Sequence, residues 1–550
     1  MTSRHGLWIL LVVFAAGWFC NLGYRHLVKP DEGRYAEIPR EMVASGDWLT
    51  PRLNGFKYFE KPALQYWATA AAFEVFGQKE WAARLWPAVT GFLGVLFVFW
   101  VGNRVFGPPS GLYGAAVAAS SALYASIGHV LTLDMALSFF MSASVFAFAA
   151  AQSDPSSETE RRRWMLLAWA AAALAVLSKG LVGIVLPAGA AALYVLIERD
   201  WRVLGRLHLL SGGLLFLAIA APWFIAVSLA NPEFFRFFFI HEHFERFTTR
   251  EHGRYQPLWY FVPVLLAGIL PWIVGLFPAL LRAWTRVPET RFQPRRFLLL
   301  WCAVVFAFFS ASDSKLASYI LPIFPALALL IGIHLASASP RFALVQSGVA
   351  ASLGIALVAA ALWASANLAE VLMLLEPDIP SELYAAYLPW LTAGGIALAV
   401  AGLASAALRG RPAAAALTLA FGGLACVQIV LSGHETLAPA FSAYHVVQKI
   451  RGDVKPDVPF YVVDTFDHTL PFYLNRTVTM VGVKDELTQP IAWEPQKFLP
   501  DAAAFARAWE SDRDAFAMFS ANDLDGFLKA HPIPVRIVAR DPRRVIVRKP

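Results

Sequence analysis

Residues 207–229, LHLLSGGLLFLAIAAPWFIAVSL, contain no Asp, Glu, Lys or Arg. A helix crosses a bilayer with about 20 mostly apolar residues, so this run is long enough to span one. The whole chain has the same character, because 58% of its 550 residues are hydrophobic and only 15% are charged. Average globular chains carry about 25% charged residues. The composition therefore excludes disordered, coiled-coil and collagen-like chains and predicts a polytopic membrane protein.

Thirteen such runs follow one another before residue 434, and we expect each to be a transmembrane helix. The first is interpreted as an uncleaved anchor, because Cys20 follows bulky Trp18 and Phe19 instead of the small residues of a cleavage site. Cys20, Cys302 and Cys426 all lie in apolar runs, which predicts neither a disulfide framework nor a metal cluster. The thirteen runs are 7–25, 85–103, 109–127, 132–151, 164–178, 180–197, 207–229, 257–280, 296–311, 316–338, 343–366, 387–408 and 413–433.

Basic residues in the short connections predict the orientation of the chain. With the N-terminus in the cytoplasm, the short outer loops hold only Lys179 and Lys315 as basic residues. We therefore expect the N-terminus inside and the C-terminus outside. The net charge of +7 then reflects orientation, and nucleic-acid binding is not expected. The sixteen arginines on the cytoplasmic side are Arg4, Arg104, Arg161, Arg162, Arg163, Arg199, Arg202, Arg206, Arg282, Arg286, Arg291, Arg295, Arg296, Arg341, Arg409 and Arg411.

Three longer segments fall on the outer side of this topology: 26–80, 230–256 and 436–550. In the first, positions 31, 35, 38 and 42 share one helical face, which predicts an amphipathic helix lying at the membrane surface. Residues 60–76 predict a second juxtamembrane helix, which Pro62 would open. In 230–256, interleaved aromatic and charged residues also suit the membrane interface.

The last segment changes composition, because charged residues become frequent and short β-branched runs appear. These features divide the chain into a membrane domain, 1–435, and a small soluble α/β domain, 436–550. The domain shows no phosphate loop, metal-ligand spacing or catalytic triad. Its predicted strands are 460–463, 478–481, 535–538 and 544–548, with helices at 502–509 and 523–530.

The remaining charges collect at the outer ends of the predicted spans. Ionisable groups near membrane depth are costly and therefore indicate function. Such charges at one edge suit an enzyme working at one membrane face, whereas a transporter should place them near the bilayer midplane. The residues of this outer rim are Asp31, Glu32, Arg34, Lys57, Glu60, Lys61, Arg84, Asp134, Lys179, His241, His243, Arg246, Asp313 and Lys315.

Several of these residues also have an ordinary structural explanation. Asp31 and Asp134 could each be the N-cap of a helix, and the neighbouring charges at 60 and 61 could be solvated. Lys179, in a hairpin of small residues, suits a phosphate. His241 and His243 lie about 200° apart on a helix, so metal binding would need one histidine together with Glu60.

Seven motifs on the outer side of the predicted topology carry a family resemblance. The motifs are 31–42 (DEGRYAEIPREM), 46–53 (GDWLTPRL), 58–62 (YFEKP), 133–134 (LD), 178–180 (SKG), 241–247 (HEHFERF) and 315–322 (KLASYILP). They resemble the aminoarabinose (4-amino-4-deoxy-L-arabinose) lipid A transferases, which are polyprenyl-phosphate-sugar-dependent GT-C glycosyltransferases related to protein O-mannosyltransferases. The resemblance covers most of residues 1–330 and implies a GT-C fold, here with about 13 transmembrane helices and periplasmic juxtamembrane helices.

The resemblance implies a donor, an undecaprenyl-phosphate sugar, and an acceptor, a lipid A phosphate. Asp31, Lys61 and Asp134 are then the expected catalytic residues, with Lys61 stabilising the leaving phosphate. No cofactor is required, although a divalent metal on Glu60 and His241 is a candidate. The expected substrate-binding residues are Glu32, Arg34, Tyr35, Tyr58, Glu60, Lys179, His241, Arg246, Lys315 and Tyr319.

The same resemblance implies a monomer in the bacterial inner membrane, with the active site in the periplasm. Transfer would invert the anomeric carbon and give resistance to cationic peptides such as polymyxin. Two alternatives stay open at this point. One is a related transferase for another polyprenyl-phosphate sugar with lipid A, a glycan or a protein as acceptor. The other is a flippase of a lipid-linked sugar.

Overall fold

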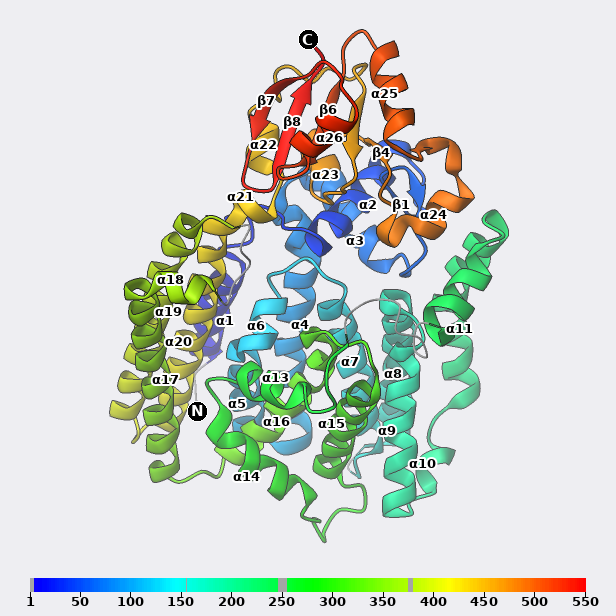
Figure 1. Ribbon diagram of the computed structural model, residues 1–550. Coiled ribbons are helices and arrows are strands. Elements are labelled where there is room, and N and C mark those ends of the chain that lie inside the picture. Colours follow the sequence, from blue (N-terminus) through cyan, green and yellow to red (C-terminus); the bar gives the residue numbers. More distant parts are fainter. Residues whose placement is uncertain (1–3, 155, 246–254, 374–378) are drawn as a thin grey trace.

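The computed structural model describes residues 4–154, 156–245, 255–373 and 379–550. It shows a bundle of helices with a small α/β domain at one end (Figure 1). Helices α2 (Asp31–Ser45) and α3 (Leu64–Phe76), from the predicted first outer segment, lie between the bundle and that domain. The α10 turn (Arg202–Gly205) and α14 (Ile273–Trp284) lie at the opposite end. The predicted outer segments 26–80 and 436–550 thus meet at one end of the molecule.

Every predicted span coincides with helix. The helices of the bundle are α1 (Arg4–Phe19), α4 (Glu80–Phe106), α5 (Pro108–Ser120), α6 (Ala122–Ile127), α7 (Asp134–Gln152), α8 (Glu158–Lys179), α9 (Val182–Glu198), α10 (Arg202–Gly205), α11 (Leu209–Ala230), α13 (Phe261–Gly268), α14 (Ile273–Trp284), α15 (Pro294–Ala311), η2 (Ala317–Ile323), α16 (Phe324–Leu335), α17 (Pro340–Ala366), α18 (Leu368–Leu372), α19 (Ser381–Ala407) and α20 (Pro412–Gly433).

The spans are less regular than the sequence predicts. Eight helices in the described part of the chain are long and apolar enough to cross a membrane, and a pair bent by 111°, α13 and α14, makes a ninth. The predicted span 109–127 is broken into α5 and α6. α1 and α9 are shorter apolar helices, and α8 opens with the charged run 158–163. The architecture is that of a polytopic membrane protein.

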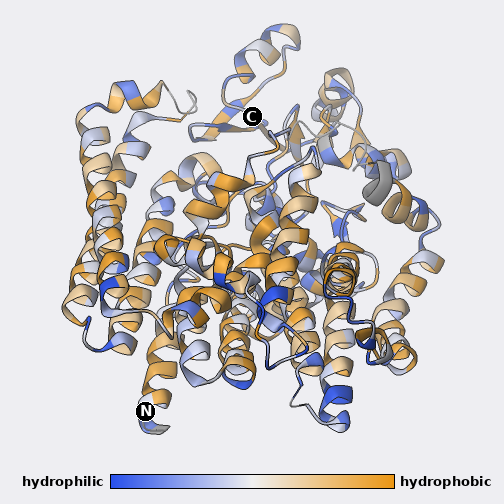
Figure 2. Cartoon of the chain, turned by 90° about the horizontal axis from the view of Figure 1, so that it is seen from below, coloured by the Kyte–Doolittle hydropathy of each residue, from blue (hydrophilic) through white to orange (hydrophobic). Residues whose placement is uncertain are grey.

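The lateral surface of the bundle is suited to contact with lipid. On α11, Leu210 and Leu229 are 79% and 80% exposed. An exposed apolar surface on a helix long enough to cross a bilayer fits a membrane contact. Seen from below, apolar residues dominate the helices across the bundle, and hydrophilic residues gather mainly in the connecting turns (Figure 2).

The C-terminal domain is built on a six-stranded sheet of order β5-β4-β3-β6-β8-β7. The first four strands in this order are parallel to one another. β8 is antiparallel to both of its neighbours, β6 and β7. Four strands and two helices were predicted from the sequence, whereas β5 and β6 were not. The elements are α22 (Tyr444–Gln448), β3 (Phe460–Val463), α23 (Leu470–Leu474), β4 (Thr479–Val481), η4 (Asp485–Leu487), α24 (Thr488–Trp493), η5 (Pro495–Lys497), β5 (Phe498–Leu499), α25 (Ala502–Ser511), β6 (Phe516–Ser520), α26 (Leu524–Ala530), β7 (Arg536–Arg540) and β8 (Arg544–Arg548).

Alternation along the strands gives this sheet two covered faces. Phe460 and Val462 pack in one apolar cluster with Val446 of α22. Tyr461 and Val463 pack in another, with helices α25 and α26. The result is three layers, which confirms the α/β class predicted for this segment.

The first outer segment folds as α2 (Asp31–Ser45), a hairpin of β1 (Arg52–Leu53) and β2 (Phe56–Lys57), and α3 (Leu64–Phe76). The prediction that α2 lies amphipathically on the membrane surface is wrong, because every residue from 32 to 42 is buried. Gly33 explains the close packing, since a Cβ there would come within 2.6 Å of the backbone of His468. α3 begins at Leu64, so Pro62 precedes the helix instead of opening it.

Ion pairs and hydrogen bonds join this segment to the C-terminal domain. Asn54 exchanges two hydrogen bonds with the backbone of Val478, of 2.9 and 2.7 Å. Arg52 donates to both oxygens of Glu494 at 3.1 Å. The chain passes from the last bundle helix to the C-terminal domain through a short connection, η3 (His434–Leu437) and α21 (Ala438–Phe441). Residues 26–80 and the C-terminal domain therefore form one layer over the bundle.

Within α2, a buried acid predicts how stability depends on pH. Arg40 pairs with Glu37 through two hydrogen bonds of 2.6 Å. Burial, and next the Glu37 charge, raise the pKa of Glu41 to about 8. The folded chain therefore keeps a proton that the unfolded chain loses above its ordinary pKa of 4.5. Stability from this group is complete below that value and is lost as the pH rises through 8.

We expect Glu41→Gln to remove part of this loss of stability at high pH, because the glutamine side chain stays neutral. Its carbonyl oxygen can still accept the hydrogen bond that the Gly55 backbone N–H donates to Glu41 at 2.8 Å in the wild type. Thermal unfolding of the purified protein at about pH 5 and about pH 9 measures the effect. The midpoint should fall less for Glu41→Gln than for the wild type, while the exposed control Glu74→Gln should follow the wild type. Equal falls in all three proteins would show that Glu41 is ionised in the fold.

Candidate active site at the outer end of the bundle

Arg34 connects the charged residues of α2 to the C-terminal domain. Arg34 donates to Asp31 at 3.2 Å and, through Nε, to Glu486 at 3.0 Å. His468 contacts the same Glu486 oxygen at 2.8 Å. The Arg34 side chain is nearly buried, while Asp31 remains 40% exposed. Asp31 is therefore an accessible carboxylate held by a fixed cation.

Three tyrosines surround this arginine. Tyr35, Tyr58 and Tyr66 are buried, and Arg34 lies 5.7 Å from the centre of the Tyr35 ring. Burial raises the pKa of all three phenols, so each keeps its proton. The hydroxyls of Tyr58 and Tyr66 have no hydrogen-bond partner among the described residues. Buried donors without partners are costly, which suits a polar ligand at this position.

A second charged group joins the ends of α7 and α8. Lys179, the last residue of α8, forms an ion pair with Asp134, the first residue of α7. Its ammonium lies 4.8 Å from the centre of the Tyr319 ring. Lys179 is also within electrostatic reach of Asp31. The first-loop acid and the pair on α7 and α8 are therefore neighbouring charges.

Lys61 and Glu60 lie in the connection between β2 and α3. The Lys61 ammonium is 2.8 Å from the Glu60 carbonyl oxygen and 3.9 Å from its carboxylate. Both side chains are mostly buried, at 15% and 12% exposure. The solvated alternative for these two residues is therefore wrong. Glu60 is also within electrostatic reach of Arg34, which places the pair beside the tyrosines.

Glu32 has a different environment from its neighbour Asp31. It forms a buried pair with Arg84, with two hydrogen bonds of 2.7 Å, and accepts from the Leu131 amide at 3.0 Å. Burial alone would raise the pKa of Glu32, but the Arg84 guanidinium holds that pKa down at about 2. Both carboxylate oxygens are used, so the structure favours a role for Glu32 in joining α2 to α4.

The cap alternatives for Asp31 and Asp134 are wrong. Each is the first residue inside its helix, and the N-cap positions are Pro30 and Leu133, without a side-chain cap. The two carboxylates are therefore available for the ion pairs described above.

Lys315 is not joined to this group by any contact of the described residues. Its buried ammonium donates to the backbone carbonyls of Ser312 and Gln256, the latter at 2.8 Å. The segment η1 (Arg236–Glu245) contains His241, but the side chain of His241 and all of Arg246 lie outside the described residues. The metal pair Glu60 and His241 therefore stays a prediction.

The C-terminal domain supplies an acid that the sequence interpretation missed. Glu486 comes from the run Lys484-Asp485-Glu486, which reads as an ordinary charged turn. Its partner Arg34 lies 452 residues away in sequence. Tyr66, which was not among the predicted site residues, is buried beside the site. Only the pairing of opposite charges across the fold, which one sequence does not show, could have identified Glu486.

Taken together, the site presents Arg34, Lys61 and Lys179 as cations, with Asp31 and Asp134 as acids. Cations arranged beforehand stabilise negative charge that develops in a transition state. The acids hold these cations in place and can accept a proton. The site lies at one end of the bundle, not halfway along it, so it suits chemistry on a group at the membrane surface.

Comparisons with known proteins identify the fold and the class of protein. A family model described as dolichyl-phosphate-mannose-protein mannosyltransferase matches residues 5–238, and one described as aminoarabinose transferase C-terminal domain matches residues 446–549. An oligosaccharyltransferase from Archaeoglobus fulgidus has the same fold, with a TM-score of 0.52 at 13% identity over 87% of this chain and 64% of that chain. The class is that of integral-membrane glycosyltransferases with the GT-C fold.

Two closer similarities fix the family. ArnT from Cupriavidus metallidurans, bound to undecaprenyl phosphate, superposes with a TM-score of 0.92 at 39% identity, over 99% of this chain and 98% of that chain. An undecaprenyl phosphate-α-4-amino-4-deoxy-L-arabinose arabinosyl transferase from Edwardsiella ictaluri is 34% identical over 60% of this chain, and the match spans 59% of its own length. The chain belongs to this arabinosyl transferase family, as the sequence motifs predicted.

Proposed function

We propose that this protein transfers 4-amino-4-deoxy-L-arabinose from undecaprenyl phosphate to a phosphate of lipid A. The observation that carries the proposal is the group of three cations and two acids at the outer end of the bundle. The similarity to a structure that holds undecaprenyl phosphate supports the donor. We further propose that the protein acts as a monomer in the bacterial inner membrane.

In this reaction a lipid A phosphate oxygen attacks the anomeric carbon of the sugar, and the bond from that carbon to the undecaprenyl phosphate oxygen breaks. Direct displacement inverts the anomeric carbon. The leaving phosphate gains negative charge, which Lys61 is placed to stabilise. The attacking phosphomonoester has a second pKa near about 6 and is largely ionised. Asp31 and Asp134 therefore orient the sugar ammonium or take the last proton, and a strong base is not needed.

The bundle offers room for the polyprenyl tail. An apolar cavity of about 310 Å³ lies between α7, α8 and α9, lined among others by Val145, Met165 and Trp169. α7 and α8 also carry Asp134 and Lys179. Residue 145 lies roughly 15–20 Å along α7 from Asp134, at 1.5 Å per residue. A donor with its phosphate at Lys179 could place part of its tail in this cavity.

The arginine distribution supports the orientation that we propose, with the N-terminus cytoplasmic and the site periplasmic. α10 (Arg202–Gly205) and α14, which carry arginines of the cytoplasmic set, lie at the end opposite the C-terminal domain (Figure 1). Positive residues remain on the cytoplasmic side during insertion. Both lipids are then met at the outer leaflet.

Purified protein mixed with the donor lipid and lipid A tests the function, with mass analysis of the lipids. Transfer of the sugar to lipid A is the expected result. The same protein in vesicles distinguishes the flippase alternative, because a flippase moves the donor across the bilayer without acceptor. Donor movement without any transfer would overturn the proposal. Transfer of a different sugar under the same conditions would support the related-transferase alternative.

A further inference from the structure

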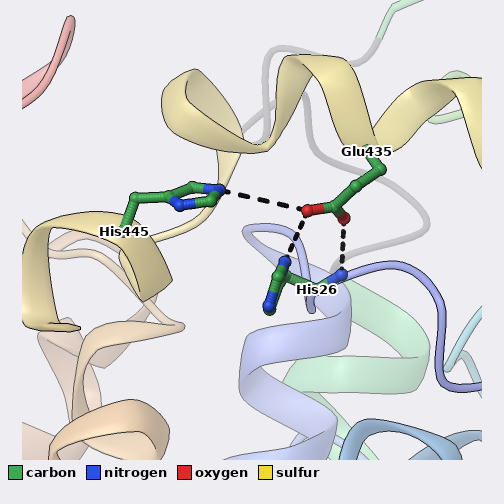
Figure 3. A group of neighbouring side chains, drawn as sticks. All are labelled: His26, Glu435 and His445. Carbon is green, nitrogen blue, oxygen red and sulfur yellow. Dashed lines mark hydrogen bonds and ion pairs between the residues drawn. The ribbon is translucent and has the colours of Figure 1, made fainter.

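Two histidines and a glutamate meet on the side of the molecule where the C-terminal domain joins the bundle. His26 lies between α1 and α2, Glu435 lies in η3 after the last bundle helix, and His445 lies in α22. Their potential ligand atoms are all within 4.8 Å of one another. Figure 3 shows both imidazole rings facing the same Glu435 carboxylate. The proposed sugar transfer does not use this group.

The distances are close to those of a metal site. His26 Nδ1 lies 2.5 Å and His445 Nε2 3.9 Å from Glu435 Oε1. With zinc bonds of about 2.0–2.1 Å in tetrahedral geometry, neighbouring ligand atoms lie about 3.3 Å apart. The His26–Glu435 separation must therefore widen, and the His445–Glu435 separation must shorten by a similar amount. The two histidine nitrogens, which lie within 4.8 Å of each other, must also reach about 3.3 Å.

The carboxylate is already oriented for this task. The His26 backbone amide donates to Glu435 Oε2 at 2.8 Å, which leaves Oε1 toward the two rings (Figure 3). Tyr444 stacks on the His26 ring at 3.6 Å between ring centres. Contacts of this kind fix the orientation of metal ligands in known sites.

Access to the cluster also fits. The His445 side chain is 40% exposed, whereas those of His26 and Glu435 are about 20% exposed. An ion could therefore enter from the His445 side.

We propose that His26, Glu435 and His445 bind one divalent transition-metal ion of the zinc class, with water in the remaining position. Two imidazoles and one carboxylate form an established ligand set for such ions. Its ligands come from the first loop, the end of the last bundle helix and the C-terminal domain. The bound ion would fix these three segments to one another, through residues that the proposed transfer does not use.

Metal titration of the purified full-length protein, after removal of metal with a chelator, tests this proposal. Zn²⁺ content per chain and Co²⁺ absorption in the visible range are the readouts. We expect His445→Ala and Glu435→Gln to lose one ion per chain, or to bind it more than about 100-fold more weakly. Loss of a residue that only supports a metal ligand lowers metal affinity by at most about 100-fold, so a larger loss indicates a direct ligand. His531→Ala, a histidine of the same domain outside the cluster, should bind like the wild type.

A third variant locates the ion directly. His445→Cys should keep the ion and add a Co²⁺–thiolate charge-transfer band that the wild type lacks. Gel filtration and circular dichroism verify that each variant is folded. Wild-type metal content and affinity in both His445→Ala and Glu435→Gln would overturn the proposal, as would the absence of a new band in His445→Cys. An ion bound elsewhere, such as at Glu60, would remain in all three variants, and its retention distinguishes it from the ion of this cluster.

Discussion

Replacing Lys61 by alanine should lower the rate of sugar transfer by a factor of about 10²–10³, the usual effect of removing one preorganised donor from a developing anion. Lys61 is largely buried, and its ammonium is held by the Glu60 carbonyl at 2.8 Å. It therefore needs no reorganisation when the phosphate leaves. The rate constant for transfer, measured with donor lipid and lipid A in detergent, is the readout.

Lys79→Ala is the matched control, because Lys79 belongs to the same outer segment and is exposed. Its transfer rate should equal that of the wild type. A folded Lys61→Ala protein with a rate within about twofold of the wild type would remove Lys61 from the mechanism. The leaving phosphate would then be stabilised by Arg34 or Lys179 alone.

Replacing Asp31 by asparagine should lower the transfer rate by about 10²–10⁴, the range for a positioned acid or base. The change keeps the shape of the side chain and removes its charge. Asp31 is the exposed acid of the site, 3.2 Å from Arg34 and within electrostatic reach of Lys179. Initial rates over a range of donor concentrations give kcat and KM separately. A loss mainly in KM would indicate that Asp31 binds the sugar ammonium, and a loss mainly in kcat would indicate proton transfer.

Glu74→Gln, which neutralises an exposed acid of α3, is the control for Asp31→Asn and should leave both constants unchanged. Thermal unfolding separates activity from folding, since an exposed side chain should contribute little to stability. Near-normal kcat and KM in a folded Asp31→Asn protein would contradict both roles of this residue.

Much of the fold could be predicted because membrane helices have a strong local signal. The run 207–229 and its equivalents have to be apolar regardless of their neighbours, and each coincides with helix. The bend of 111° between α13 and α14 depends on packing and has no such signal. In the C-terminal domain, β6 is buried in the centre of the sheet and was missed. Its sequence FAMFS lacks the β-branched residues that identified the other strands.

The site was predicted in part, because its motifs lie in the first outer segment and at the ends of α7 and α8. The contact of Lys179 with Asp134 and Tyr319 joins three of those motifs. What the sequence did not show is the cover above them. The C-terminal domain packs against α2 and provides Glu486, which lies 452 residues from Arg34. Long-range charge pairing of this kind leaves no periodic pattern in a single sequence.

The central claim is that this protein adds aminoarabinose to lipid A, and the most direct test is the mass spectrum of lipid A from cells. A bacterial strain that makes the donor lipid but lacks its own transferase would express the wild type or Lys61→Ala at equal levels. The account predicts a lipid A species heavier by one 4-amino-4-deoxy-arabinose residue with the wild type, and its near absence with Lys61→Ala. Unmodified lipid A in wild-type cells that contain the donor would contradict it.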